Sequence, residues 1–186
     1  MMGLALPPTA ERFEWLEDTL RLAAQMWAGD DTGFHGAYHH LGRPLNSPNA
    51  VTRPHPPILV GGTGERRTLR LVARYADACN VFDIPDGGAT IRRKLAVLAE
   101  HCATVGCPYD DIEKTASTRW AADESPEAFT RRCADLAALG IEHVVVLTTG
   151  PWTDTAVATL GAARPAVEPL APAAKMAIDN RGRQRR

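Results

Sequence analysis

The spacing of apolar residues along the chain predicts a helix near its start. Apolar side chains recur every three or four residues between Thr9 and Gly29. This period predicts a helix with Thr9 as its N-cap and Gly29 as its stop. Residues 30–57 lack the period and are rich in Gly, His, Asn and Pro. They predict a long loop or a short hairpin.

From residue 58 onward, short apolar runs alternate with amphipathic stretches. The runs predict strands at 58–60, 78–82, 113–121 and 143–147. Each run is followed by helical spacing, and the last of these helices is expected over 152–162. The alternation predicts an α/β fold with parallel strands. Four strands are too few to close a barrel of eight, so an open doubly wound sheet and one half of a barrel both remain open.

One helix start is marked clearly, and the C-terminal end has a different composition. Ser125 followed by Pro126 predicts an N-cap and a first-turn proline. Residues 163–186 are rich in Ala and Pro and end in a basic run. We therefore expect a domain over residues 1–162 and a disordered tail over 163–186.

Composition and charge exclude several classes of protein. Hydrophobic residues make up 45% and charged residues 23% of the chain, which is typical of globular domains and excludes disorder throughout. The formal net charge of -1 gives no electrostatic reason to bind nucleic acid or an anionic membrane. Apolar runs are too short to cross a bilayer, and no secretory signal is visible. We expect a cytoplasmic location.

The strongest local signal for chemistry is the stretch ILVGGTGERR, residues 58–67. A strand ends, glycines permit a tight turn, and a helix begins, so backbone N–H groups and the positive end of the helix dipole face the same place. A phosphate fits there, and Arg66 or Arg67 would add charge-assisted hydrogen bonds. A plain strand–helix turn, in which glycine serves only the backbone, explains the same pattern.

Nucleotide motifs fit this stretch less well. A dinucleotide fingerprint needs a third glycine where Arg67 stands, although Asp83 and Asp86 lie near the offset of its acidic residue. A Walker A loop is excluded because no Gly-Lys-Ser/Thr follows. A dinucleotide site therefore stays a minor alternative.

Other reactive side chains point to structural roles. His35, His39 and His40 lie close together, but Gly36 and Tyr38 between them indicate a hairpin, so we expect no metal site. No CxxC pair is present, and the cysteines are expected to be core residues. They are Cys79, Cys102, Cys107 and Cys133.

Residues 53–80, RPHPPILVGGTGERRTLRLVARYADACN, resemble the signature of the luciferase-like flavin and deazaflavin oxidoreductases. The helix after Pro7, the hairpin at 34–41 and the segment 92–114 resemble the family too. The resemblance covers about residues 5–150. It is greatest to the subgroup that uses coenzyme F420.

The resemblance implies a bacterial-luciferase-type TIM barrel in which this glycine turn lies in the second half and holds the cofactor phosphate. The cofactor would be coenzyme F420, or alternatively FMN. Asp77 would be structural. The expected cofactor-binding residues are the matched Gly61, Gly62, Thr63 and Gly64, the cationic Arg66 and Arg67, and Asn80 on the following strand.

The resemblance also implies that the first half of the barrel has no counterpart in this sequence. We therefore expect an incomplete barrel of about four βα units after an N-terminal helix, with its catalytic residues unidentified. The implied function is hydride transfer with coenzyme F420, or flavin-dependent monooxygenation, on a small-molecule substrate by a truncated chain. The alternative is a non-catalytic remnant that keeps only the phosphate loop. Open sheet edges predict a homo-oligomer.

Overall fold

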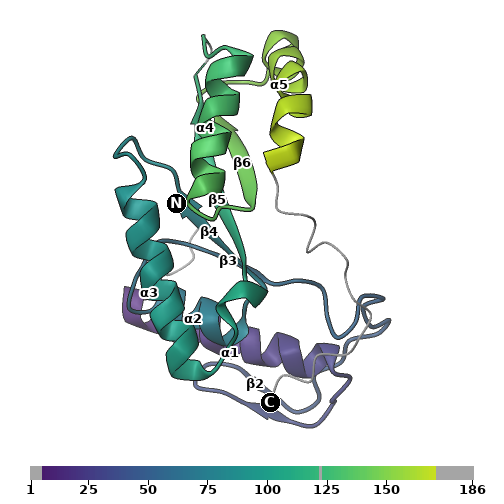
Figure 1. Cartoon of the computed structure of the whole chain (residues 1–186). Coiled ribbons are helices and arrows are strands. Elements are labelled where there is room, and N and C mark those ends of the chain that lie inside the picture. Colours follow the sequence, from purple (N-terminus) through teal and green to yellow (C-terminus); the bar gives the residue numbers. More distant parts are fainter. Residues whose placement is uncertain (1–5, 122, 171–186) are drawn as a thin grey trace. The chain divides into compact units, whose positions relative to one another are not determined.

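The computed structural model describes residues 6–121 and 123–170. Within these residues the chain divides into two compact units, one up to Pro57 and one from Ile58 (Figure 1). The division falls where the long predicted loop meets the first predicted strand.

The first unit is a helix and a hairpin, as the sequence predicts. Helix α1 spans Thr9–Trp27, and the strands β1 (Phe34–His35) and β2 (His40–Leu41) pair antiparallel. The prediction of Thr9 as N-cap was wrong by one residue. Pro8 holds that position because its extended backbone leaves its carbonyl free to accept the first helical bond, from Arg12 N at 3.1 Å.

The second unit is built on a parallel sheet. Its strands are β3 (Leu59–Gly61), β4 (Ala78–Phe82), β5 (Glu113–Trp120) and β6 (His143–Thr148), in the order β3-β4-β5-β6. All four were predicted to within about two residues of their bounds. Doubly wound sheets reverse their strand order at a switch point, and this order has no reversal. Of the two options that the sequence left open, the sheet therefore has the order of a barrel segment.

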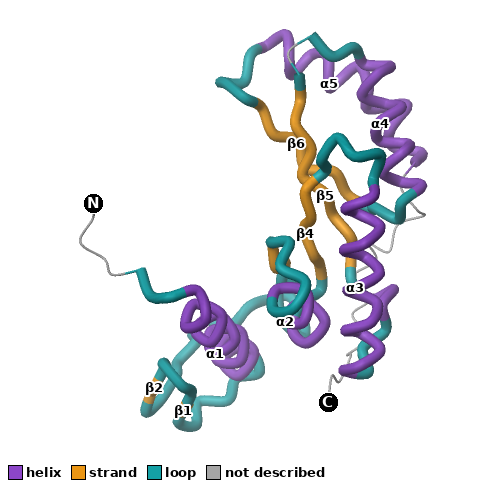
Figure 2. Tube along the Cα trace, turned by 90° about the vertical axis from the view of Figure 1, so that its left-hand side faces the viewer, coloured by secondary structure: helices purple, strands orange, loops and turns teal. Residues whose placement is uncertain are grey.

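The helices of the second unit follow the strands in turn. They are α2 (Thr68–Tyr75), α3 (Ala89–Val105), α4 (Pro126–Ala138) and α5 (Asp154–Val167), with short 3₁₀ turns η1 (Tyr109–Asp111) and η2 (Glu168–Leu170). Figure 2 shows α3 and α4 on the same side of the strands.

The last helix extends further than the sequence predicts. Its predicted end at residue 162 was too early, and the expected disorder was wrong for residues 163–170, which are helical. Ala163 is only 2% exposed and packs with Phe129 and Cys133 of α4, which offsets the helix-breaking tendency of Pro165. Residues 171–186 of the predicted tail lie outside the described residues, and the domain division there stays a prediction.

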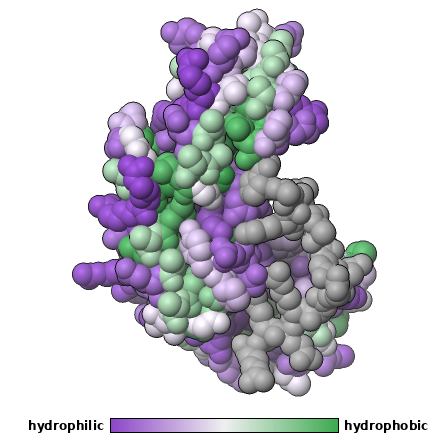
Figure 3. Space-filling model, viewed as in Figure 1, coloured by the Kyte–Doolittle hydropathy of each residue, from purple (hydrophilic) through white to green (hydrophobic). Residues whose placement is uncertain are grey.

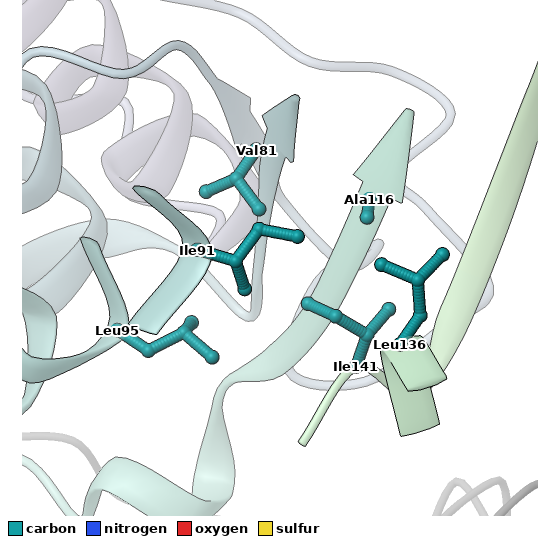
Figure 4. Close-up of a cluster of buried hydrophobic side chains, with 6 residues drawn as sticks. All are labelled: Val81, Ile91, Leu95, Ala116, Leu136 and Ile141. Carbon is teal, nitrogen blue, oxygen red and sulfur yellow. The ribbon is translucent and has the colours of Figure 1, made fainter. Parts of the chain in front are cut away.

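The core of the second unit lies between the sheet and its helices. One cluster joins strand residues to α3, α4 and the turn after α4 (Figure 4): Val81, Ile91, Leu95, Ala116, Leu136 and Ile141. Because side chains alternate along a strand, the residues between these point to the opposite side of the sheet, here called the far face. The far face carries Leu59, Gly61, Asn80, Phe82, Thr115, Ser117, Arg119, Val145 and Leu147.

The surface mixes polar and apolar residues. Figure 3 shows hydrophilic and hydrophobic residues interspersed on the face in view. Large exposed hydrophobic residues include Leu59, Phe82 and Leu147 of the far face. In the described part of the chain, no helix combines the length and apolar character needed to span a membrane.

Candidate functional site

The turn from Gly61 to Gly64 connects β3 to α2, as the sequence predicts. Gly61 ends β3 and pairs with Asn80 of β4, and Gly62 N donates to the Asn80 carbonyl at 3.3 Å. Gly64 accepts a hydrogen bond of 3.1 Å from Leu69 N in the first turn of α2. The glycine turn is therefore fixed at both ends, by the neighbouring strand and by the helix that follows it.

Two of these glycines are required by the packing of the turn itself. Gly62 has φ +130°, and a Cβ there would lie 3.1 Å from Thr68 Cγ2. A Cβ on Gly64 would lie 2.8 Å from Thr68 Oγ1. The Thr68 side chain is buried, so the turn wraps around it. Gly62 and Gly64 thus have a structural explanation, as the plain strand–helix interpretation expects.

Gly61 differs from the other two. Its φ is not in the left-handed region, and a Cβ built on it meets nothing within 4 Å. The backbone of Gly61 therefore faces open space on the far face of the sheet, where a ligand can approach it closely. Unlike Gly62 and Gly64, Gly61 is therefore a glycine that the packing of the turn does not require.

An anchor that the sequence analysis missed holds the turn on α3. Glu65 binds Lys94 Nζ at 2.7 Å and Arg93 Nε at 2.9 Å, and its carbonyl accepts a 2.7 Å hydrogen bond from His101 Nε2. The hydrogen bond from Lys94 and the charge of Arg93 hold the pKa of the Glu65 carboxyl below its ordinary value. The one acidic residue in the turn is thereby balanced by two cations.

Asn80 lies on the far face, beside the turn. Its Nδ2 donates to Thr115 Oγ1 at 2.8 Å, and its Oδ1 accepts from Ser117 Oγ at 2.9 Å. The sequence points to Asn80 but not to Thr115 or Ser117. The signal was available in part, because strand alternation puts Thr115 and Ser117 on one face of β5. Only the strand register shows that this face is the one that carries Asn80.

The structure brings some predicted site residues together and leaves others apart. Asn80 contacts Gly62 directly and pairs with Gly61. Thr63 is half-buried in the turn, and Arg66 is exposed after it. Among the described residues, no contact joins Arg66 to Asn80. Arg67, also exposed, has an interaction of its own and stands at the N-cap of α2.

The acidic residues of the dinucleotide alternative are used by the fold. Asp83 Oδ2 accepts a 2.7 Å hydrogen bond from Thr118 Oγ1, and Asp86 Oδ2 accepts one of 2.9 Å from Thr90 N at the start of α3. Asp77, expected to be structural, accepts from Ile58 N at 2.9 Å. Because both Asp83 and Asp86 hold these structural contacts, nothing supports a ribose-binding role for either.

Two buried cysteines and the histidines of the hairpin are further candidates for reactive groups. Burial raises the pKa of Cys79 to about 11 and that of Cys102 to about 12, so neither thiol is a thiolate near neutral pH. The rings of His35 and His40 lie 6.2 Å apart in the hairpin. Over residues 6–121 and 123–170, no three His, Cys, Asp or Glu side chains gather in a way that could hold a metal ion.

Two curated relatives match part of the chain. F420-dependent glucose-6-phosphate dehydrogenase of Microbacterium testaceum is 25% identical over 114 residues, which are 60% of this chain and 32% of that protein. The protein of the same name from Kineococcus radiotolerans is 26% identical over 133 residues, 67% of this chain and 36% of that protein. The chain therefore spans about a third of the length of these relatives.

Solved structures share the fold at lower identity. An F420-dependent secondary alcohol dehydrogenase, in complex with an F420–acetone adduct, superposes with a TM-score of 0.76 at 13% identity, over 89% of this chain and 65% of that one. A monooxygenase of Streptomyces bottropensis superposes with a TM-score of 0.60 at 16% identity, over 87% of this chain and 62% of that one. These likenesses show the fold of the luciferase-like barrels over most of this chain.

The model of one protein family, described as luciferase-like monooxygenase, matches residues 1–179. This range includes the glycine turn, all four strands of the parallel sheet and the first unit. The resemblance on which the sequence analysis relied is thereby confirmed, and the chain belongs to the luciferase-like monooxygenase family.

Proposed function

We propose that this chain forms the cofactor-phosphate side of a luciferase-like oxidoreductase that uses coenzyme F420, or FMN in its place, on a small-molecule substrate in the cytoplasm. The family match and the F420-dependent relatives support the cofactor class. The match covers only about a third of the length of these relatives, so we propose the whole reaction for a complete barrel and not for this chain alone.

The observation that carries the proposal is the open position beside Gly61. The backbone there borders open space, Asn80 lies next to it on the same face, and Arg66 and Arg67 follow in an exposed turn. A cofactor phosphate would be held by the Gly61–Gly64 backbone and these cations. Bound coenzyme F420 supplies hydride transfer, and bound reduced FMN supplies oxygen activation. The chain's own residues bind and orient the cofactor.

A non-catalytic half-barrel is the second candidate. The packing of Gly62 and Gly64 around Thr68 favours it, because a turn that needs these glycines for its own shape keeps them without a ligand. In either case the sheet of the described residues ends at β3 and β6, and we propose that copies of the chain associate through these edges and the exposed apolar side chains of the far face.

Binding titrations of the purified chain with coenzyme F420, and with FMN beside it, separate the two candidates. Saturable micromolar binding is expected if the turn is a cofactor site. Gly61→Val should weaken it about tenfold, since the added side chain enters the ligand's space at a cost of about 1.4 kcal/mol. Gly61 is preferred to Gly62 for this test because its φ is outside the left-handed region and a Cβ there meets no neighbour within 4 Å.

Gly161→Val is the matched control, because its Cβ also meets nothing and it lies in α5, away from the turn. The control should bind the cofactor like the unmodified chain. Undiminished binding by Gly61→Val would remove the turn as the site. If the folded chain binds neither cofactor, the result supports the second candidate, a non-catalytic half-barrel.

A further inference from the structure

The far face carries a chain of side-chain hydrogen bonds whose direction is fixed. Thr115 Oγ1 lies 2.9 Å from the Cys79 carbonyl oxygen, which can only accept. The single hydroxyl proton of Thr115 is therefore donated to Cys79. Thr115 Oγ1 then has no proton left to donate to the Asn80 side chain, whose amide lies 2.8 Å away, so it can only accept a hydrogen bond from it.

This fixes the orientation of the Asn80 amide. The atom facing Thr115 must be the donor Nδ2, so the acceptor Oδ1 faces Ser117 at 2.9 Å. Ser117 donates its only hydroxyl proton to that oxygen. Ser117 Oγ consequently offers only lone pairs to any further group, while Asn80 Nδ2 keeps one N–H that this chain of hydrogen bonds does not use.

The pair lies where ligands bind in sheets of this kind. Asn80 is directly opposite Gly61, the last residue of β3, and Ser117 is opposite Phe82, the last residue of β4, so the pair lies level with the carboxyl ends of these two strands. Binding residues of α/β barrels lie at that end. Thr115 is 2% exposed, whereas Asn80 and Ser117 are both half-buried and accessible.

We propose that Ser117 and Asn80 together recognise a ligand group in which an N–H or O–H donor stands beside an acceptor. Ser117 Oγ accepts from the donor, and the second N–H of Asn80 donates to the acceptor. This inference rests on the proposed function. Two sources offer this chemistry: the imide edge of the pyrimidine ring in a flavin or deazaflavin, and a hydroxyl-bearing substrate.

The first arm of the test compares FMN with 3-methyl-FMN, in which a methyl group replaces the imide hydrogen. Ser117→Ala should weaken FMN binding roughly three- to tenfold, the effect of one lost hydrogen bond. The unmodified chain should bind 3-methyl-FMN more weakly than FMN, and Ser117→Ala should weaken 3-methyl-FMN no further. Ser117→Thr, which keeps the hydroxyl, is the matched control and should bind FMN like the unmodified chain.

The second arm tests the substrate as source. If Ser117→Ala leaves FMN affinity unchanged, 2-propanol binding to the FMN-loaded chain is measured by ligand-observed NMR, with isopropyl methyl ether as the probe without a hydroxyl. Weaker 2-propanol binding by Ser117→Ala, with ether binding unchanged, assigns the contact to a substrate hydroxyl. Should Ser117→Ala not fold, Asn80→Asp removes the N–H donor of the same pair and is tested in both arms.

The outcomes separate this inference from the proposed function. Unchanged affinity for both FMN and 2-propanol, in a variant that folds and binds cofactor, overturns the role of Ser117 and leaves the proposed function intact. Absence of cofactor binding by the unmodified chain overturns the proposed function and this inference with it.

Discussion

A single buried carboxylate ties the hairpin of the first unit to its helix. Asp18 Oδ2 accepts hydrogen bonds from Tyr38 N at 2.8 Å and His39 N at 3.4 Å. Burial acts to raise the pKa of Asp18, but these donors and the Arg21 guanidinium outweigh it, so the pKa lies below its ordinary value. Gly36 lies against the same carboxylate, where a Cβ would come within 2.2 Å of Oδ2. No other residue fits there without displacing the acid.

The lowered pKa of Asp18 makes the stability of the first unit depend on pH. The ionised form stabilises the fold fully above the ordinary carboxyl pKa, and this contribution is lost as the pH falls through the folded-state value. Asp18→Asn should cost about 1–2 kcal/mol at pH 7, from lost charge-assisted hydrogen bonds. The difference from the unmodified chain should shrink at pH 3. Urea unfolding at both pH values measures it.

Asp31→Asn is the control for this prediction. Asp31 pairs with Arg43 at 2.7 Å on the surface, where both side chains are exposed. Such a pair contributes little, so the substitution should change stability by less than about 1 kcal/mol at pH 7. An equal loss for Asp18→Asn at pH 7 and pH 3 would contradict the role given to its charge.

At the scale of residues, the sequence points to only part of the candidate site, whose function stays a prediction. Gly61 and Asn80 were predicted because a glycine turn and a strand residue can be read locally. Ser117 was missed, since its partner Asn80 lies 37 positions away and only the strand register joins them. The contact of Glu65 with Lys94 was missed for the same reason, being a tertiary contact between a turn and α3.

The two predicted N-caps give a contrast at the scale of elements. Ser125 is a true cap, because its Oγ accepts a 3.2 Å hydrogen bond from Ala128 N and Pro126 fills the first helical turn. Thr9 is not a cap and instead accepts a 2.8 Å hydrogen bond from Arg12 Nη2 within α1. A residue of the right type therefore caps a helix only where the backbone changes from extended to helical at that residue.

Ser125→Ala should lower the free energy of unfolding of the second unit by about 1 kcal/mol, because it leaves an N–H of α4 unsatisfied. Thr9→Ala, the matched control, should change stability by less than about 0.5 kcal/mol, as is usual for a surface position. Chemical unfolding followed by circular dichroism compares the two. A loss for Thr9→Ala as large as that for Ser125→Ala would contradict the assignment of the caps.

The strands and most helices could be predicted because their apolar periods are short and local. The end of α5 could not. Pro165 indicates a break in an Ala- and Pro-rich stretch, yet the helix continues to Val167. What holds it is packing: Leu160 and Val167 lie against the cluster around Trp120 and Phe129. That packing depends on residues of β5 and α4, which lie too far from Pro165 in the sequence for a local pattern to include them.

At the scale of the whole molecule, the sheet of the second unit leaves apolar side chains uncovered. On the far face Phe82 is 50% exposed, Val145 38% and Leu147 41%. Strand edges and exposed apolar side chains of this kind favour association.

Alternation of strands and helices in the sequence left the strand order undecided, because both a doubly wound sheet and a barrel have that pattern. Only the pairing β3-β4-β5-β6 decides between them.

We expect the chain to self-associate at micromolar concentrations through this sheet. Leu147→Lys should shift the sedimentation equilibrium toward monomer, since a charge on the far face opposes its burial. Val157→Lys is the control, because Val157 is a 57% exposed apolar residue on α5, away from the sheet. A monomer at every concentration would exclude association, and equal dissociation by both variants would exclude the far face as the contact.

The order of the strands bears on how the polypeptide is made. Each strand of the parallel sheet after β3 pairs with the strand that precedes it in the sequence. During synthesis, β4 therefore leaves the ribosome when β3 is already available, and the same holds for β5 and β6. The nascent chain can add one strand and one helix at a time without waiting for a distant partner, which keeps loop-closure costs small.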